Sequence, residues 1–273
     1  MFWTRNSPHL AVWQRAGALI LFLVFVPVSA RAQATSPTPA PSPDQAAEKE
    51  PARDPVENAD DFKSKLTFSV YFTKDSQAYD LNLRHQFGPN LTAWIAGFKD
   101  TEGTELLRIG AQYDYRKRWF HFVPSGEVET TKGVSLSLAS ELGYNTIAIV
   151  GYSRTNLKTF FDLFWDPGDS VTLGVGHKIS SYDRIQAFTV FDVRLHTGQQ
   201  NTHVLYRRKL NRNNGITFDV VFKSGHLDSG EYIRAVGAGL YYDRPKWFWK
   251  FYYDPFVNYT DRTMVRTGIG LKF

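Results

Sequence analysis

From Leu66 to the C-terminus, the sequence alternates apolar residues with polar or small ones, position by position. The alternation is clearest in residues 66–73, 79–84, 107–116 and 216–223. Successive side chains of a β-strand point to opposite faces, whereas a helix repeats its apolar residues every three or four positions. The pattern therefore predicts a series of strands, each with one apolar face and one polar face.

Turn-forming sequences separate these strands. They are Gly-Pro-Asn at 88–90, Asp-Pro-Gly-Asp at 166–169, Asn-Asn-Gly at 213–215 and Asp-Arg-Pro-Lys at 243–246. Glycine, proline, asparagine and aspartate each favour the backbone angles of tight turns. Strands joined in sequence by such turns predict an all-β, up-and-down antiparallel arrangement.

Two features favour a transmembrane β-barrel over a soluble β-sandwich or a lipocalin-like barrel. The polar face carries too many charges to form a packed core. Aromatic residues also gather at the ends of segments, as in 119–122, 160–165 and 247–253. Rings of this kind line the two interfaces of a lipid-facing band, whereas an aromatic outer face on a soluble protein promotes aggregation.

The first 61 residues differ from the rest. Arg5 and Arg15 flank an N-terminal region that leads into the apolar run 16–28, and small residues follow at 30–34. This pattern predicts a signal peptide over 1–32, with an uncleaved anchor helix as the alternative. Residues 33–61 are rich in proline, alanine and charge, which predicts a disordered periplasmic linker that acts as a spacer or contacts a partner. The barrel is expected over 62–273.

Charge and cysteine content exclude several classes of protein. Residues 62–273 hold 27 basic and 20 acidic side chains, so the expected barrel is net positive. The basic residues form no clustered stripe, and no nucleic-acid partner is expected. The chain has no cysteine, which excludes disulfides and a lipid-bearing N-terminal cysteine.

The last ten residues carry a second signal. One face of this segment holds Val265, Thr267, Ile269, Leu271 and Phe273, and the other holds Arg266, Gly268, Gly270 and Lys272. An alternating segment that ends in an aromatic residue resembles the C-terminal assembly signal of bacterial outer-membrane proteins. The chain as a whole resembles the porin-like superfamily as a class.

This resemblance implies recognition by the barrel-assembly machinery and insertion into the outer-membrane lipid bilayer of a Gram-negative envelope. It also implies that the linker and the C-terminus are both periplasmic, which requires an even number of strands. A spanning strand needs about 9–11 residues. Twelve strands are preferred and fourteen come next.

Charged residues on the polar face are candidates to line the lumen. They are Arg84, Arg108, Asp114, Arg116, Asp192, Arg194, Asp219, Lys223 and Lys250. In a narrow barrel, such residues pair across the interior and close it. In a wider barrel, a net-positive wall favours anions. The expected function is a small passive pore with a mild preference for anionic solutes, and the alternative is a closed structural or adhesive barrel.

A third hypothesis, an outer-membrane hydrolase, has no motif to support it. Such enzymes need an activated nucleophile, and the sequence holds no His-x-Ser pair. The segment His226-Leu227-Asp228 reverses an Asp-x-His arrangement and lies in a polar stretch that is better interpreted as a loop. We therefore expect no catalytic residues, no cofactor, no metal site and no enzymatic activity.

Overall fold

The computed structural model describes residues 62–130, 133–155, 169–193, 198–211 and 213–273. The predicted signal peptide (1–32) and linker (33–61) lie outside the described residues. Within the described residues, no helix is long and apolar enough to cross a membrane.

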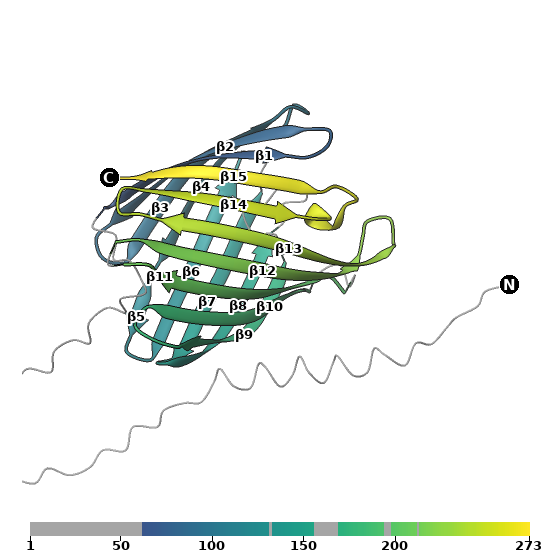
Figure 1. The fold of residues 1–273 in the computed structure, drawn as a ribbon. Helices are drawn as coiled ribbons and strands as arrows, with labels where there is room; N and C mark the ends of the chain where they lie inside the picture. The colour runs from purple at the N-terminus through teal and green to yellow at the C-terminus, as the bar shows by residue number, and fades with distance from the viewer. Residues whose placement is uncertain (1–61, 131–132, 156–168, 194–197, 212) are drawn as a thin grey trace, which may run out of the picture. The chain divides into compact units, whose positions relative to one another are not determined.

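The described residues form one antiparallel sheet in which strands adjacent in sequence pair with each other (Figure 1). Strand β1 pairs with the last strand, β15, and the additional pairing of β4 with β6 closes the sheet into a barrel. The predicted all-β antiparallel barrel is confirmed. The strands are β1 (Ser64–Phe72), β2 (Gln77–Phe87), β3 (Leu91–Asp100), β4 (Glu105–Tyr113), β5 (Tyr115–Lys117), β6 (Phe120–Glu129), β7 (Val134–Gly143), β8 (Thr146–Thr155), β9 (Ser170–Lys178), β10 (Asp183–Asp192), β11 (Gln200–Lys209), β12 (Gly215–His226), β13 (Tyr232–Asp243), β14 (Trp247–Asp254) and β15 (Met264–Lys272).

The short strand β5 continues β4 past a break in the ladder. The pairs Gln112↔Ser125 and Tyr115↔Phe122 keep the same register on both sides of the break. At the break, Tyr113 faces Pro124, which has no N–H to donate. The amide of Asp114 instead donates to the carbonyl oxygen of Asn90 on the other side, at 2.7 Å. Strands β4 and β5 therefore occupy one position in the barrel wall, and the break between them lies opposite Pro124 of β6.

The barrel has fourteen wall positions, with β5 as a short extra piece. The preferred count of twelve strands is wrong, and the alternative of fourteen is what the structure has. Twelve strands leave about 17 residues for each strand and its connection. The actual turns at one end are shorter than that spacing assumes, such as residues 144–145 between β7 and β8.

The two faces of the wall differ in chemistry. Outward positions are apolar and exposed, such as Leu81 at 51% and Ile269 at 52%, whereas the inward Asp80 is 1% exposed. A wall that is apolar outside and charged inside reverses the pattern of a soluble protein and is typical of a barrel in lipid. The described aromatic segments only partly follow the prediction, because Phe248 and Tyr252 point inward.

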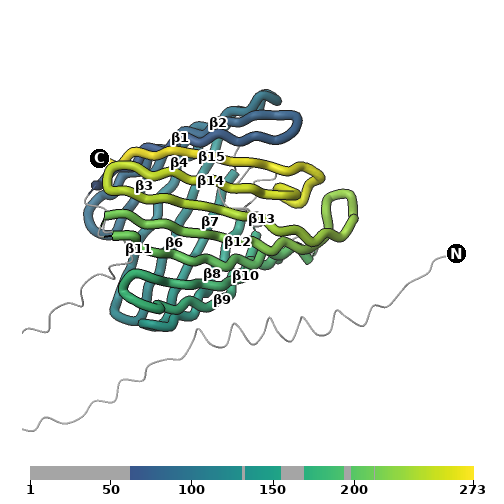
Figure 2. Tube along the Cα trace, in the orientation of Figure 1, coloured from purple at the N-terminus to yellow at the C-terminus, as the bar shows by residue number. Residues whose placement is uncertain are grey.

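The two ends of the barrel differ in the length of their connections (Figure 2). At the Phe273 end the turns are short, and the termini of the sheet meet there: the amide of Ser64 donates to the carbonyl oxygen of Phe273 at 2.8 Å, and the Phe273 amide donates back at 3.0 Å. At the opposite end, which we call the Tyr259 end, the connection between β14 and β15 spans residues 255–263 and contains the short 3₁₀ helix η1 (Val257–Tyr259). Long loops at one end and short turns at the other are a feature of outer-membrane barrels.

Candidate functional site: the barrel lumen and its mouth

The predicted lumen-lining residues lie at different heights in the barrel. Arg84, Arg108, Asp219, Lys223 and Lys250 share the inward face of the wall with the buried Asp80 and Asn201. Asp114 and Arg116 lie near the Phe273 end, and Asp192 lies near the Tyr259 end. The ninth candidate, Arg194, lies outside the described residues. Arg234, by contrast, lies on the outward face, and its guanidinium carbon is 6.0 Å from the centre of the Tyr232 ring.

Arg108 lies at the centre of a buried ion-pair cluster. Its guanidinium pairs with the carboxylate of Asp80, and its Nη1 atom lies 3.8 Å from Oε1 of Glu127. The indole Nε1 of Trp94 donates to the other oxygen of Glu127 at 2.6 Å. Breaking a buried pair from one side leaves an uncompensated charge in a dry environment, so we expect this cluster to fix the positions of β2, β3, β4 and β6 relative to one another.

Two cations next to this cluster have no such partner. Within the described part of the chain, the side chains of Arg84 and Lys250 form no ion pair or hydrogen bond. The guanidinium carbon of Arg84 lies 4.6 Å from the centre of the Trp94 ring. Lys250 lies within electrostatic range of Arg84, Arg266 and Asp80. The local charge is still positive: Arg84, Arg108, Lys250 and Arg266 stand against three carboxylates, those of Asp80, Glu127 and Glu129, the last of which lies opposite Arg108 in the β4–β6 ladder.

Glycines on the inward face let large side chains lie flat along the wall. The Lys250 side chain passes over Gly268, where a Cβ would come within 2.7 Å of its Cε atom. The ring of Tyr252 lies over Gly239 in the same manner, and the Trp94 ring lies over Gly110. Arg266 in turn stacks on Tyr252, with 4.4 Å from its guanidinium carbon to the ring centre. Side chains held in this way occupy the wall more than the centre of the lumen.

The facing wall carries charges that are paired. Asp219 accepts from Nδ1 of His203 at 3.0 Å, and the His203 ring stacks on Phe188 with 4.8 Å between ring centres. The fully buried Lys223 donates to Oδ1 of Asp254 at 2.7 Å. The charge of these groups is compensated locally, so this wall adds less to the field in the lumen than Arg84 and Lys250 do.

A third group of charges lies near the Phe273 end. The carboxylate of Asp114 lies 3.0 Å from Nε2 of His121, and Arg116 contacts the same ring at 2.9 Å. Glu141 pairs with Arg184 at 2.8 Å. The structure thus brings together the predicted Asp114 and Arg116, and it separates them from the central cluster.

The segment His226–Asp228, considered for hydrolysis, forms part of the mouth. The His226 ring packs against Tyr232 at 5.1 Å, and Leu227 is buried beside Ile233 and Tyr259. The amide of Asp228 donates to the carbonyl oxygen of Tyr259 at 3.2 Å. Within the described residues, no group of three or more histidine, cysteine, aspartate or glutamate side chains is placed to hold a metal ion.

Sequence reasoning missed several residues of the lumen. Glu127 follows the alternation and was recoverable by extending it through residues 120–129. Arg266 was placed on the polar face of the last strand but was not included among the lumen candidates. Trp94 gave no signal, because both faces of β3 are largely apolar and its inward face holds Trp94, Ala96 and Phe98. Tyr259 lies in a connection, where alternation carries no information.

A closed antiparallel barrel with an apolar exterior and a charged lumen is the fold typical of transmembrane β-barrels. The outer membrane protein Omp33 of Acinetobacter baumannii is similar to this chain, with a TM-score of 0.51 and 10% identity over 78% of this chain and 98% of that one. The KdgM porin (TM-score 0.43, 9% identity, 77% and 99% coverage) and the NanC porin (TM-score 0.44, 8% identity, 77% and 100% coverage) are also similar. No protein-family model and no curated protein matches the sequence. The likeness to Omp33 is a likeness of fold.

Proposed function

We propose that this chain is a passive outer-membrane channel for small solutes, with a preference for anions. The observation that carries the anion preference is the pair of inward cations, Arg84 and Lys250, that have no ion-pair partner among the described residues. Fixed charge in a narrow aqueous passage with low-dielectric walls raises the local concentration of ions of the opposite sign.

The location of the channel follows from its surface. The exposed apolar outward face needs lipid around it. The signal peptide expected over 1–32 and the assembly signal that ends at Phe273 both favour export to the outer membrane through the barrel-assembly machinery. In this arrangement the Phe273 end faces the periplasm and the Tyr259 end faces outward.

The competing function is a closed structural or adhesive barrel. It is favoured by the paired charges of the wall and by the connection 255–263, which reaches side chains inside the mouth. In that case, the linker 33–61 would carry the contact with a partner. Catalysis is not part of either proposal, because the hydrolase hypothesis rested on no motif.

Planar-bilayer recordings in a KCl gradient test the channel. We expect conductance with a reversal potential of the sign that marks anion preference. Reversing both charges (Arg84→Glu with Lys250→Glu) should shift that potential toward cations. The control is Lys246→Glu, which changes an exposed lysine in the β13–β14 turn, outside the lumen. Absence of conductance favours the closed barrel, and a cation-preferring parent channel refutes the anion proposal.

A further inference from the structure

The hairpin formed by β12 and β13 projects beyond β14 and β15 at the Tyr259 end of the barrel (Figure 1). Strands β12 and β13 pair along their whole length, up to His226↔Tyr232. Strand β14, by contrast, pairs with β13 only over residues 238–243. Within the described stretch 213–273, residues 232–237 of β13 therefore have β12 on one side and no strand on the other.

The sequence explains why β14 ends early. Asp254 is followed by Pro255, which has no N–H to continue a ladder, and then by Phe256, whose φ of 52° departs from the extended conformation. Phe256 packs against a buried apolar cluster that includes Ile233 on the inward face of β13. The chain therefore leaves the wall toward the interior and does not continue alongside β13.

Alternate residues of β13 direct their backbone hydrogen bonds to opposite neighbours. The amide of Leu227 donates to the carbonyl oxygen of Glu231 at 2.8 Å in the β12–β13 turn. The amide of Arg244 donates to the carbonyl oxygen of Trp247 at 2.9 Å in the β13–β14 turn. In an antiparallel sheet this alternation continues along the strand, so odd-numbered residues of β13 bond to β12 and even-numbered residues face the β14 side.

The even-numbered residues beyond the end of β14 form an open strand edge, which we name the β13 edge: Tyr232, Arg234 and Val236. Within the described chain, their N–H and C=O groups form no backbone hydrogen bond on the β14 side. The inner end of the edge reaches the lipid-facing band, because Val236 (54% exposed) lies opposite Phe222 (50% exposed) on β12. Unpaired strand edges are a template for one more strand and do not persist in hydrocarbon, so a partner strand would satisfy these groups.

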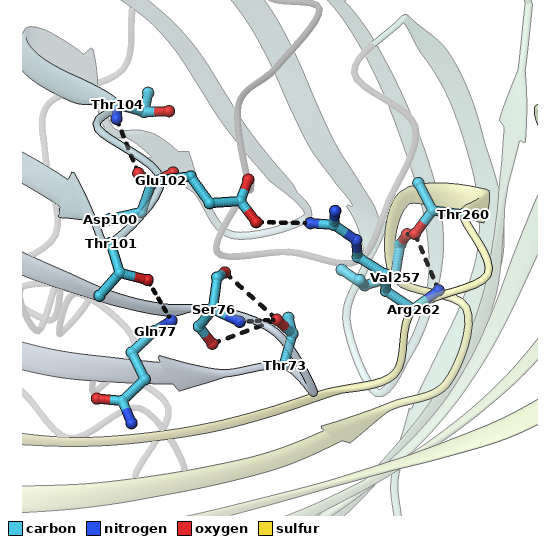
Figure 3. Close-up of polar contacts among 10 residues, drawn as sticks. All are labelled: Thr73, Ser76, Gln77, Asp100, Thr101, Glu102, Thr104, Val257, Thr260 and Arg262. Atoms are coloured by element: carbon cyan, nitrogen blue, oxygen red, sulfur yellow. Dashed lines mark hydrogen bonds and ion pairs between the residues drawn. The ribbon is translucent and has the colours of Figure 1, made fainter.

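The rim around β1 to β4 is closed in a different way. The amide of Gln77 donates to Oγ1 of Thr101 at 3.0 Å, and the amide of Thr104 donates to Oδ1 of Asp100 at 2.7 Å (Figure 3). Side-chain oxygens there accept from backbone donors at the strand ends. Among the residues that the structure describes, no side chain caps the β13 edge in this manner.

Arg234 gives the β13 edge a positive charge. Its side chain is exposed on the outward face, its guanidinium carbon lies 6.0 Å from the centre of the Tyr232 ring, and it has no ion-pair partner in the described chain. The acidic residues of the hairpin, Asp228 and Glu231, lie beyond the edge in the turn. In an added strand, the side chain opposite Arg234 would be favoured as an acid, and those two positions away on either side would be favoured as apolar.

We propose that the β13 edge is a docking site for an extended segment of a partner protein, which adds to β13 as a further strand at the Tyr259 end. The segment that it fits carries an acidic side chain opposite Arg234 and apolar side chains two positions away on either side. In this mode of recognition, main-chain hydrogen bonds supply affinity and alternate side chains supply selectivity. The site goes beyond the proposed channel and does not depend on whether the lumen conducts.

Fluorescence anisotropy of a labelled peptide on the barrel refolded in detergent tests the site. The probe is the peptide Thr-Val-Thr-Glu-Thr-Val-Thr, and its control carries N-methyl groups on the amides that would bond to β13. The parent should bind the probe and not the methylated peptide. Arg234→Glu should weaken binding about tenfold, because like charges would then lie opposite each other. Lys99→Glu, which reverses an exposed outward cation on the fully paired strand β3, is the matched control and should bind as the parent does.

Hydrogen exchange of the backbone amides, followed by NMR, locates the bound peptide. Without peptide, the amides of Tyr232, Arg234 and Val236 should exchange rapidly, whereas those of Ile233 and Ala235, which bond to β12, should exchange slowly. The probe should slow exchange at the three edge positions by about tenfold or more. Val236→Pro removes one donor from the edge without removing a bond to β12, and it should weaken binding.

Heat-modifiable migration on gels establishes that each variant is a folded barrel before it is measured. A parent that does not bind the probe overturns the proposal, and so does equal binding of the methylated peptide. Equal weakening by Arg234→Glu and Lys99→Glu overturns it as well. The exchange measurement uses the parent alone, so binding that leaves the three edge amides unprotected overturns the proposal even if a variant fails to fold.

Discussion

The guanidinium carbon of Arg84 lies 4.6 Å from the centre of the Trp94 ring, so this cation is held on an aromatic face and not against a carboxylate. Trp94 is fixed in turn by its hydrogen bond to Glu127. An arginine stacked on an aromatic ring keeps its full charge and its hydrogen-bond donors available to a passing anion. Glu127 therefore makes the electrostatic potential around Arg84 less positive without forming an ion pair with it.

Glu127→Gln should strengthen anion preference. The amide keeps an oxygen to accept from Trp94 but removes one negative charge near Arg84 and Arg108. A unit charge about 8 Å away in water changes the energy of an ion by roughly 0.5 kcal/mol, in opposite directions for anion and cation, so the permeability ratio should rise by up to about fivefold. Reversal potentials measure this ratio. Glu105→Gln removes the same charge from an exposed pair with Lys99 and should leave the ratio unchanged.

Anion preference should weaken as salt rises. The Debye length is about 10 Å at 0.1 M and about 3 Å at 1 M, so concentrated salt screens Arg84 and Lys250 from ions in the middle of the lumen. Reversal potentials measured at a constant concentration ratio, first in dilute and then in concentrated KCl, should move toward zero. A preference that is independent of salt would point to a dehydrated contact site in place of a diffuse field.

Inward glycines should tolerate no side chain where an aromatic ring lies over them. At Gly110, a Cβ would come within 2.3 Å of Cζ2 of Trp94 and within 2.8 Å of the Gly126 carbonyl oxygen. Gly110→Ala should therefore displace the Trp94 ring, break its hydrogen bond to Glu127 and cost about 1–3 kcal/mol of stability, as overpacking does. Urea titration of the barrel refolded in detergent, followed by tryptophan fluorescence, measures the change.

Gly97→Ala is the matched control. Gly97 lies on the adjacent strand β3, and a Cβ there meets no atom within 4 Å. Equal losses of stability at the two positions would show that the glycines matter for backbone freedom alone, and the ring-over-glycine explanation would then be wrong.

The sequence predicted the strands and their two faces because alternation is a local property, and it holds through β2, β4 and β12. The number of strands was harder to predict, since it depends on turn length and on breaks such as the one opposite Pro124. The lumen was recovered in part: alternation assigns Arg108 or Lys223 to a face but gives neither its partner nor its height. The inward position of the connection between β14 and β15 left no signal, because it depends on contacts between residues far apart in the sequence, such as Tyr259 with Asn201.

Phe273 offers a way to separate assembly from folding. Its backbone forms two hydrogen bonds with Ser64 that close the sheet, while its side chain points outward and is 59% exposed. Phe273→Ala keeps both backbone bonds and removes only the terminal aromatic ring. If that ring is part of the assembly signal, the variant should refold from urea into detergent as the parent does but reach the outer membrane in much smaller amounts. Heat-modifiable migration measures the first quantity, and fractionation of cell envelopes measures the second.

Phe87→Ala is the control, because Phe87 is an outward phenylalanine at the same end of the barrel and is 56% exposed. Both substitutions remove similar apolar area from the lipid-facing rim, so a general loss of membrane affinity should affect them equally. A defect in cells that is confined to Phe273→Ala assigns the ring to recognition by the assembly machinery. A defect in refolding of the same size would instead assign it to the stability of the closing β1–β15 seam, where Phe273 follows the last residue of β15.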